Sequence, residues 1–110
     1  MQSATKYAED GDLYFRLAQA LSAEDRHKEA VKAYSDAQKK GDLKKPGDVA
    51  FWKGISQMQL ERWDSATKSF RSAAKLDKKK AKQSRQYIRY IAGERRRQEE
   101  LRKMLEGVGE

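Results

Sequence analysis

Apolar and small residues recur along the chain at intervals of three and four, which is the spacing of one face of an α-helix. In the first stretch, Tyr14, Leu17, Ala18 and Leu21 lie at i, i+3, i+4 and i+7. Similar stretches separated by polar breaks predict five helices, over residues 13–23, 27–40, 49–60, 63–76 and 81–105. A short helical segment is also expected at residues 4–8. The single proline and the scarcity of β-branched residues are typical of an all-α chain.

Residues that cap or end helices mark the predicted boundaries. Asp12 follows Gly11 and is expected to cap the first of these helices, because its carboxylate can accept hydrogen bonds from the amides of the first turn. Gly41 is placed to end the second helix in the left-handed backbone conformation. Asp48 is expected to cap the third helix, after a connector that closes with the Pro46-Gly47 pair.

The chain contains an internal repeat with a period of 36 residues. Residues 13–37 and 49–73 match at a set of fixed positions, and a period of this length with small and aromatic residues at fixed places is typical of stacked helical hairpins. The identical pairs are Phe15/Phe51, Arg26/Arg62, Ala30/Ala66, Lys32/Lys68, Ala37/Ala73 and Lys39/Lys75, and the pairs that match in kind are Ala18/Gly54, His27/Trp63 and Tyr34/Phe70.

The repeated residues resemble those of the tetratricopeptide repeat (TPR) family, whose unit is a pair of antiparallel helices. The resemblance implies a right-handed α-solenoid of two TPR-like hairpins, residues 11–44 and 47–80, closed by a long C-terminal capping helix over residues 81–106. The whole chain, 1–110, then forms one domain. The residues that carry the resemblance are Leu17, Ala18, Leu21, Ala30, Tyr34 and Ala37 in the first unit and Gly54, Leu60, Trp63, Ala66, Phe70 and Ala73 in the second.

The predicted capping helix has two unlike halves. Tyr87, Ile88 and Ile91 form an apolar patch that can cover the fourth helix, whereas residues 93–100 are too polar to be packed on both sides and are expected to project into solvent. Two repeats and a cap make a short array of this kind. The chain is therefore expected either to be part of a longer protein or to associate with itself.

The chain is strongly basic, with 25 basic and 17 acidic residues and a net charge of +8. This excess, concentrated in residues 75–97, favours an acidic protein, a nucleic acid or an anionic membrane surface as a partner. No run approaches the ~20 apolar residues that cross a bilayer, and residues 1–6 lack the apolar stretch of a signal peptide. We therefore expect a soluble chain without membrane insertion, and of the compartments the cytoplasm is favoured.

The residue types needed for catalysis or for cofactor binding are scarce. There is no cysteine, which excludes disulfides, thiolate metal sites and a cysteine nucleophile. His27 is the only histidine, and its equivalence with Trp63 predicts packing or partial exposure rather than catalysis. No Ser/His/Asp grouping is indicated, and Glu9, Asp10 and Asp12 fit helix capping better than a calcium loop. The glycines are dispersed and form no phosphate-binding loop. We expect a non-enzymatic protein with no cofactor and no metal.

The resemblance implies that a ligand lies in a concave groove lined by the first helix of each hairpin. One apolar stripe lies in this region, because Phe51, Ile55 and Met58 fall at i, i+4 and i+7. We interpret this stripe as a partly exposed partner site, although the same spacing also fits a helix core. The groove positions carried over from the family are Asp12, Phe15, Gln19 and Ser22, then Asp48, Phe51, Ile55 and Met58. Of these, the residues expected to form the peptide-binding groove are Phe15, Gln19, Ser22, Phe51, Ile55 and Met58.

The chemistry of these groove residues favours an apolar or aromatic peptide, or a helical segment, as the ligand. A well-known variant of the family holds a C-terminal carboxylate with lysine, arginine and asparagine. That clamp is absent from the two units here, because the matching places hold Phe15, Gln19, Phe51 and Ile55. Arg85 and Arg89 on the capping helix form a charged rim that would draw acidic groups. The predicted function is a protein-interaction scaffold.

A nucleic-acid-binding adaptor that uses the basic fifth helix is the alternative. Lys82, Arg85 and Arg89 share a helix face at i, i+3 and i+7, a spacing that could follow a phosphate backbone with salt-sensitive binding. Glu94 interrupts the basic surface and can pair within the helix, which favours a solvated helix over a nucleic-acid site. The cluster consists of Lys78, Lys79, Lys80, Lys82, Arg85, Arg89, Arg95, Arg96 and Arg97.

Replacement of the apolar stripe tests the groove interpretation against the core interpretation. If Phe51 and Ile55 line an exposed groove, Phe51→Ala combined with Ile55→Ala weakens partner capture and leaves helicity nearly intact, as circular dichroism would show. Loss of the fold in that double variant would place these residues in the core.

Overall fold

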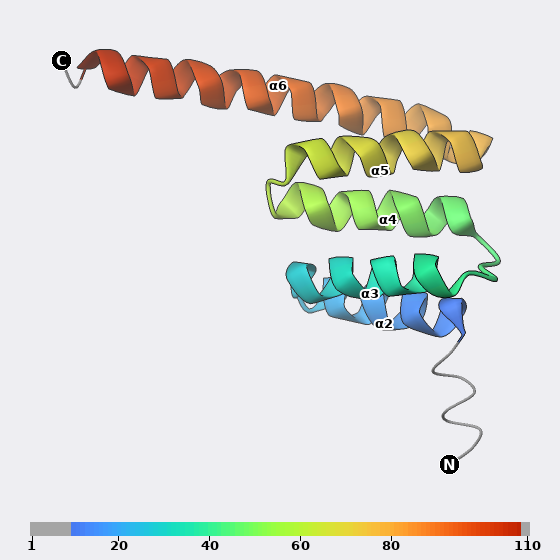
Figure 1. Ribbon diagram of the computed structural model, residues 1–110. Helices are drawn as coiled ribbons and strands as arrows, with labels where there is room; N and C mark the ends of the chain where they lie inside the picture. Colours follow the sequence, from blue (N-terminus) through green and yellow to red (C-terminus); the bar gives the residue numbers. More distant parts are fainter. Residues whose placement is uncertain (1–9, 109–110) are drawn as a thin grey trace.

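The computed structural model describes residues 10–108, and over this span the chain is all-α with no strand. The helices are α2 (Gly11–Ala23), α3 (His27–Lys40), α4 (Pro46–Gln59), α5 (Trp63–Leu76) and α6 (Lys78–Val108). Each helix packs against the next in the chain, and neighbouring helices run antiparallel (Figure 1). The molecule is elongated, 64 × 30 × 20 Å, and the outer end of α6 projects beyond the other helices.

Two of the predicted helices have the bounds expected from the sequence, and three begin earlier. The predictions for α3 and α5 are confirmed at both ends. Helix α2 begins at Gly11 because Asp10, rather than Asp12, is its cap; the Asp10 carboxylate accepts a hydrogen bond from the Asp12 amide at 2.9 Å. The short segment expected at residues 4–8 lies outside the described residues.

Helices α4 and α6 extend into the segments that were expected to be connectors. Helix α4 begins at Pro46, because a proline has no amide hydrogen to lose in the first turn and its fixed φ suits a helix; Asp48 therefore lies inside the first turn. Helix α6 begins at Lys78, since Asp77 is the only non-helical residue between α5 and α6. The Asp77 carboxylate accepts from the amide of Lys79 at 3.0 Å.

The backbone repeats with the sequence. The turn between α2 and α3 contains Asp25 at φ 60°, and the turn between α4 and α5 contains Glu61 at φ 57°. The amides of the next residues, Arg26 and Arg62, donate to carbonyl oxygens five residues earlier, each at 2.9 Å. Gly41 has φ 75° at the end of α3, which confirms its predicted role. The two hairpins are thus joined by the same turn.

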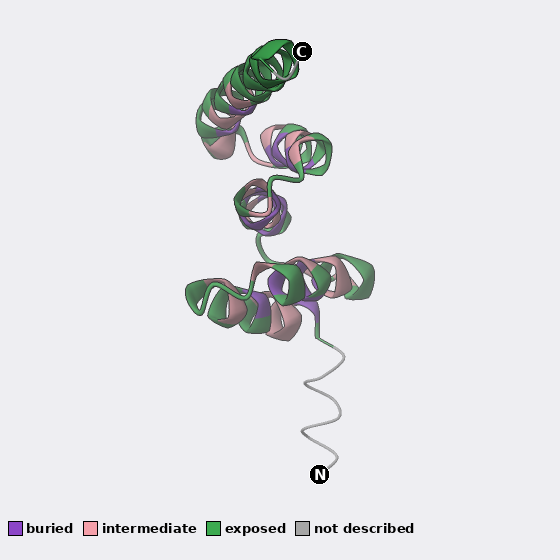
Figure 2. Cartoon of the chain, turned by 90° about the vertical axis from the view of Figure 1, so that its left-hand side faces the viewer, coloured by how far each residue is buried: buried purple, intermediate pink, exposed green. Residues whose placement is uncertain are grey.

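Close contact between the helices of each hairpin sets the core. Ala18 is fully buried in the first hairpin, and at the equivalent place in the second a Cβ on Gly54 would lie 3.0–3.1 Å from ring carbons of Phe70. Aromatic pairs fill the adjoining space. The ring centroids of Phe15 and Tyr34 are 6.0 Å apart, and those of Phe51 and Phe70 are 5.6 Å apart. Figure 2 shows the buried positions gathered where helices face one another.

Helix α6 covers the second hairpin with its first half only. The Tyr87 ring stacks on Phe70 with 5.1 Å between centroids, and Ile91 is buried. From Arg95 to Val108 every residue is exposed, so the polar stretch at 93–100 is not packed on both sides, as expected. Within residues 10–108, no helix is both long and apolar enough to cross a membrane.

The contact at Gly54 predicts a large cost for any bulky side chain there. We expect Gly54→Leu to be less stable than Gly93→Leu by about 1–3 kcal/mol, the usual cost of overpacking a filled core. Gly93 is the matched control, because a Cβ there meets no atom within 4 Å and both variants gain the same helix propensity. Thermal unfolding followed by circular dichroism measures the difference. Equal melting temperatures would contradict the close approach.

Candidate functional site

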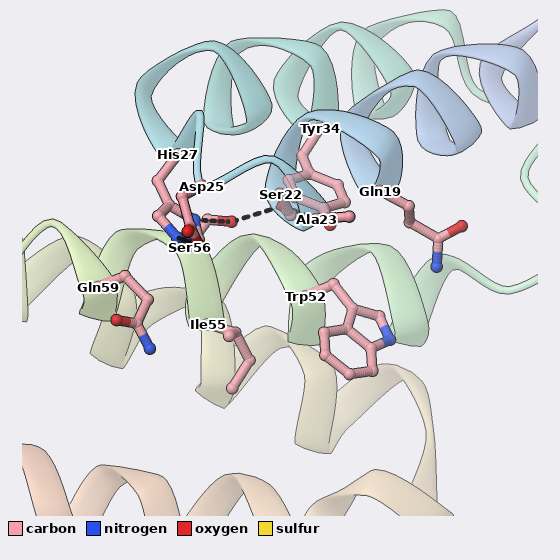
Figure 3. A pocket seen from close by; sticks show the side chains of 10 residues that line it. All are labelled: Gln19, Ser22, Ala23, Asp25, His27, Tyr34, Trp52, Ile55, Ser56 and Gln59. Carbon is pink, nitrogen blue, oxygen red and sulfur yellow. Dashed lines mark hydrogen bonds and ion pairs between the residues drawn. The ribbon is translucent and has the colours of Figure 1, made fainter.

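A hollow of about 420 Å³ lies between the end of α2 and the middle of α4; we call it the α2–α4 hollow (Figure 3). Trp52, Ile55 and Gln59 line it from α4 at i, i+3 and i+7, and Gln19 lines it from α2. The mouth is therefore bordered by an indole, an aliphatic side chain and two amides. Its full lining is Gln19, Ser22, Ala23, Asp25, His27, Tyr34, Trp52, Ile55, Ser56 and Gln59.

A chain of hydrogen bonds joins three helices at the base of this hollow. The Ser22 hydroxyl lies 3.3 Å from the Tyr34 hydroxyl and 2.9 Å from that of Ser56. Ser56 in turn lies 3.2 Å from Nδ1 of His27. Burial raises the pKa of Tyr34, and the hydrogen bond with Ser22 acts in the opposite sense. These bonds connect α2 and α3 of the first hairpin to α4 and hold the walls of the hollow in place.

The structure brings together a Ser/His/Asp grouping that the sequence analysis did not predict. His27 contacts Ser56 through Nδ1, and its Nε2 lies 3.7 Å from the Asp25 carboxylate. Two features argue against nucleophilic catalysis. Ser56 is 1% exposed and already bonded to Ser22, and the Asp25 side chain is 93% exposed and too distant from Nε2 to orient the ring by a hydrogen bond. The grouping joins two hairpins, in line with the packing role predicted for His27.

The predicted groove residues are divided among three hollows. Gln19, Ser22 and Ile55 line the α2–α4 hollow. Phe15 lines a neighbouring hollow of about 250 Å³, which we call the Phe15 hollow, and Gln19 belongs to it as well. Met58 lines a third hollow of about 240 Å³, beside α6. The structure therefore brings together part of the predicted set and separates Met58 from the rest.

Phe51 is the exception, and the expectation that it is partly exposed is wrong. It is 3% exposed, and its ring packs against the edges of the stacked Phe70 and Tyr87 rings, with centroids 5.6 and 5.8 Å away. Lys80 covers it further, with Nζ 4.9 Å from the ring centroid. Phe51 is buried because α6 supplies Tyr87 and Lys80 on the side that the sequence analysis left open. Phe15 is half-buried against Tyr34, so it also contributes to packing.

Trp52 is the residue that the sequence analysis missed. It is 39% exposed and lines the α2–α4 hollow, and its ring meets that of Phe51 edge-on at 5.4 Å. A signal for it is present in the sequence, since Trp52, Ile55 and Gln59 share a helix face. The neighbouring stripe that begins at Phe51 has the same kind of spacing. Which of the two stripes is buried depends on the position of α6, and the spacing alone does not give that position.

The charged rim lies apart from the hollows. Arg85 and Arg89 are exposed on α6, and neither lines the three hollows described above. Further along α6, Arg95 pairs with Asp64 of α5 at 2.6 Å, and Arg97 pairs with Glu94. Part of the basic cluster is thus neutralised within the chain.

Neither a metal site nor a known relative assigns a chemistry to this surface. Among the described residues, no group of three or more His, Asp or Glu side chains is placed to hold a metal ion. Comparison of the chain with protein-family models, with curated proteins and with solved structures gives no match. The geometry of the hollows is therefore the basis for a functional proposal.

The difference in burial between Phe51 and Trp52 predicts that their replacement by alanine lowers the free energy of unfolding by different amounts. We expect Phe51→Ala to lower the free energy of unfolding by about 3–5 kcal/mol, as for other buried phenylalanines. Trp52→Ala is expected to cost less than Phe51→Ala, because Trp52 is 39% exposed and loses less buried area. Urea denaturation of the two variants checks this order. The buried position of Phe51 means that helicity is no longer expected to survive its replacement by alanine. A Phe51→Ala variant as stable as the wild type would contradict this prediction.

Proposed function

We propose that this protein is a non-enzymatic interaction scaffold without a cofactor, which binds a peptide or helical segment in a concave groove. The proposal includes the finer fold predicted above, a right-handed α-solenoid of two TPR-like hairpins with a capping helix. The observation that carries it is the α2–α4 hollow, in which the exposed Trp52 and the partly buried Ile55 lie beside the polar side chain of Gln19.

The size and lining of the hollow suit an anchor side chain of a bound peptide. Its volume of about 420 Å³ falls within the range of about 300–1,000 Å³ typical of ligand sites. Binding energy at protein interfaces concentrates on a few buried aromatic residues surrounded by a polar rim. Trp52 supplies the aromatic surface, and Gln19 and Gln59 supply hydrogen-bonding groups at the rim.

The rigidity of this surface also supports a binding role. Trp52 rests against the buried ring of Phe51, and Ile55 packs against the core of the second hairpin. The hydrogen-bonded serines hold α2 at a fixed place relative to α4. A ligand therefore meets side chains that are largely ordered before it binds, which lowers the entropy lost on association. In this proposal Phe51 supports the site from beneath rather than touching the ligand.

Two alternatives remain outside this proposal. The nucleic-acid adaptor is less favoured, because Arg95 and Arg97 are paired within the chain. Self-association has one observation in its favour, an exposed apolar stripe at i, i+3, i+4 and i+7 on the projecting end of α6. Its residues are Leu101, Met104, Leu105 and Val108. Four side chains cover less area than the roughly 800 Å² per partner of a standard stable interface.

A selection from random 12-residue peptides displayed on phage tests the proposal. We expect peptides to be enriched on the protein, and Trp52→Ala combined with Ile55→Ala to weaken a selected peptide at least about tenfold, because both anchors are lost. Leu17→Ala combined with Leu101→Ala is the matched control, since both leucines are exposed outside the hollows. Fluorescence anisotropy measures affinity, and circular dichroism checks the fold. Equal loss in both double variants would refute the site.

A further inference from the structure

Basic side chains from two distant segments converge at the end of the molecule where α4 and α6 begin. There, a hollow of about 460 Å³ is bordered by Lys44 and Lys45 of the α3–α4 connector and by Lys79 and Lys80 of α6. We call it the lysine pocket. Figure 1 shows that α2, α4 and α6 all start at this end of the molecule.

A close backbone contact brings the two segments together. A Cβ on Gly47, next to the connector, would lie 2.5 Å from Cβ of Asp77, so only a glycine allows α4 to begin this near the α5–α6 junction. The lysines that meet there are about one repeat period apart in the sequence. Their convergence is a property of the stack and differs from the run of basic residues along α6.

Two carboxylates also line the pocket, and both are engaged. The Asp48 carboxylate lies 4.0 Å from Nζ of Lys80, and the Asp77 carboxylate accepts from the Lys79 amide at 3.0 Å. Within residues 10–108, no acidic side chain lies within 4.0 Å of the ammonium groups of Lys44, Lys45 or Lys79. The pocket therefore keeps three cationic groups without an acidic partner in this part of the chain.

The lysine pocket adjoins the Phe15 hollow, which in turn adjoins the α2–α4 hollow; we call the three together the candidate groove. Lys44 and Lys45 also line the Phe15 hollow, together with Arg16 and with Asp12, whose carboxylate accepts from the Lys44 amide at 3.3 Å. Gln19 lines both the Phe15 hollow and the α2–α4 hollow. Shared lining residues thus connect the three hollows in sequence. A segment that lies along them meets Trp52 at one end and the cationic groups at the other.

We propose that the lysine pocket binds side-chain carboxylates of the peptide in the groove, so that the partner is an apolar segment with an acidic stretch at one end. This inference rests on the proposed function and adds the charge and direction of the ligand. Opposite charge across an interface raises the association rate and discriminates among partners. The amino ends of α4 and α6 add partial positive charge at the same place. Acid recognition then falls to the lysine pocket rather than to Arg85 and Arg89.

The same phage selection, followed by a charge-reversal variant, tests this inference. The variant is Lys44→Glu/Lys45→Glu/Lys79→Glu, which leaves Lys80 in place because it packs on Phe51. The matched control, Lys28→Glu/Lys75→Glu/Lys103→Glu, changes three exposed lysines outside the hollows and gives the same net charge, +2 instead of +8. Affinities of one selected peptide are measured by fluorescence anisotropy, and a 20-residue oligouridylate RNA serves as a second probe.

The expected result is that selected peptides carry Asp or Glu residues beside an apolar stretch. Affinity should fall at least about tenfold in the lysine-pocket variant and less than about twofold in the control. Apolar peptides without acidic residues, unaffected by the lysine-pocket variant, would overturn this inference and leave the groove intact. Equal weakening by both triple variants would overturn it too, since a general field rather than a site would be acting.

Two further outcomes separate this inference from the proposed function. If no peptide is enriched, or if the Trp52/Ile55 variant binds as well as the wild type, the groove proposal itself fails. If the RNA binds at about 50 mM salt and loses affinity only in the lysine-pocket variant while no acidic peptide is selected, the pocket serves phosphate groups of a nucleic acid. That result would also overturn the inference.

Discussion

The close crossing of the two helices within each hairpin is the contact on which the rest of the structure depends. It requires a small residue in the first helix, which Ala18 and Gly54 supply, under an aromatic ring of the second helix. The ring then meets a phenylalanine one turn earlier on the first helix, at 6.0 Å in one hairpin and 5.6 Å in the other. Helix α6 has Tyr90 at the corresponding place, and it is 53% exposed. No described helix crosses α6 there, so a small residue is not needed.

The repeat predicts which residues of the two hairpins occupy equivalent places, but it does not predict whether their side chains are exposed to solvent. Helices α3 and α5 and the turn at Gly41 follow from local signals, and the structure has them as predicted. Exposure at Phe51 could not be predicted in this way, because it depends on whether a further helix covers it. Tyr87 lies one period beyond Phe51 and provides that cover. The repeated phenylalanine therefore has a structural role in each hairpin, and the exposed aromatic is its neighbour Trp52.

The features of the candidate site come from pairs of residues about one period apart, which stacking brings together. Ser22 and Ser56 are 34 residues apart and their hydroxyls are hydrogen-bonded, while Trp63 donates to Gln98, 35 residues on. Local spacing along one helix carries no information about such pairs. The basic composition favoured an acidic partner, and the sequence analysis assigned the contact to α6, where basic residues are most frequent. The connector contributes only Lys44 and Lys45, and their proximity to Lys79 and Lys80 arises from stacking.

The arrangement of charge along the candidate groove gives it a direction. Its start is lined by Arg16, Lys44, Lys45, Lys79 and Lys80 and by only three carboxylates, those of Asp12, Asp48 and Asp77, and the amino ends of parallel helices lie at the same end. Its far end holds carboxylates, since Asp25 lines the α2–α4 hollow and Glu61 lines the hollow beside it. Helix dipoles place positive potential at the amino ends and negative potential at the carboxyl ends, so backbone and side chains reinforce one another. An apolar segment with one acidic end would therefore be favoured in a single orientation, which a purely apolar groove does not impose.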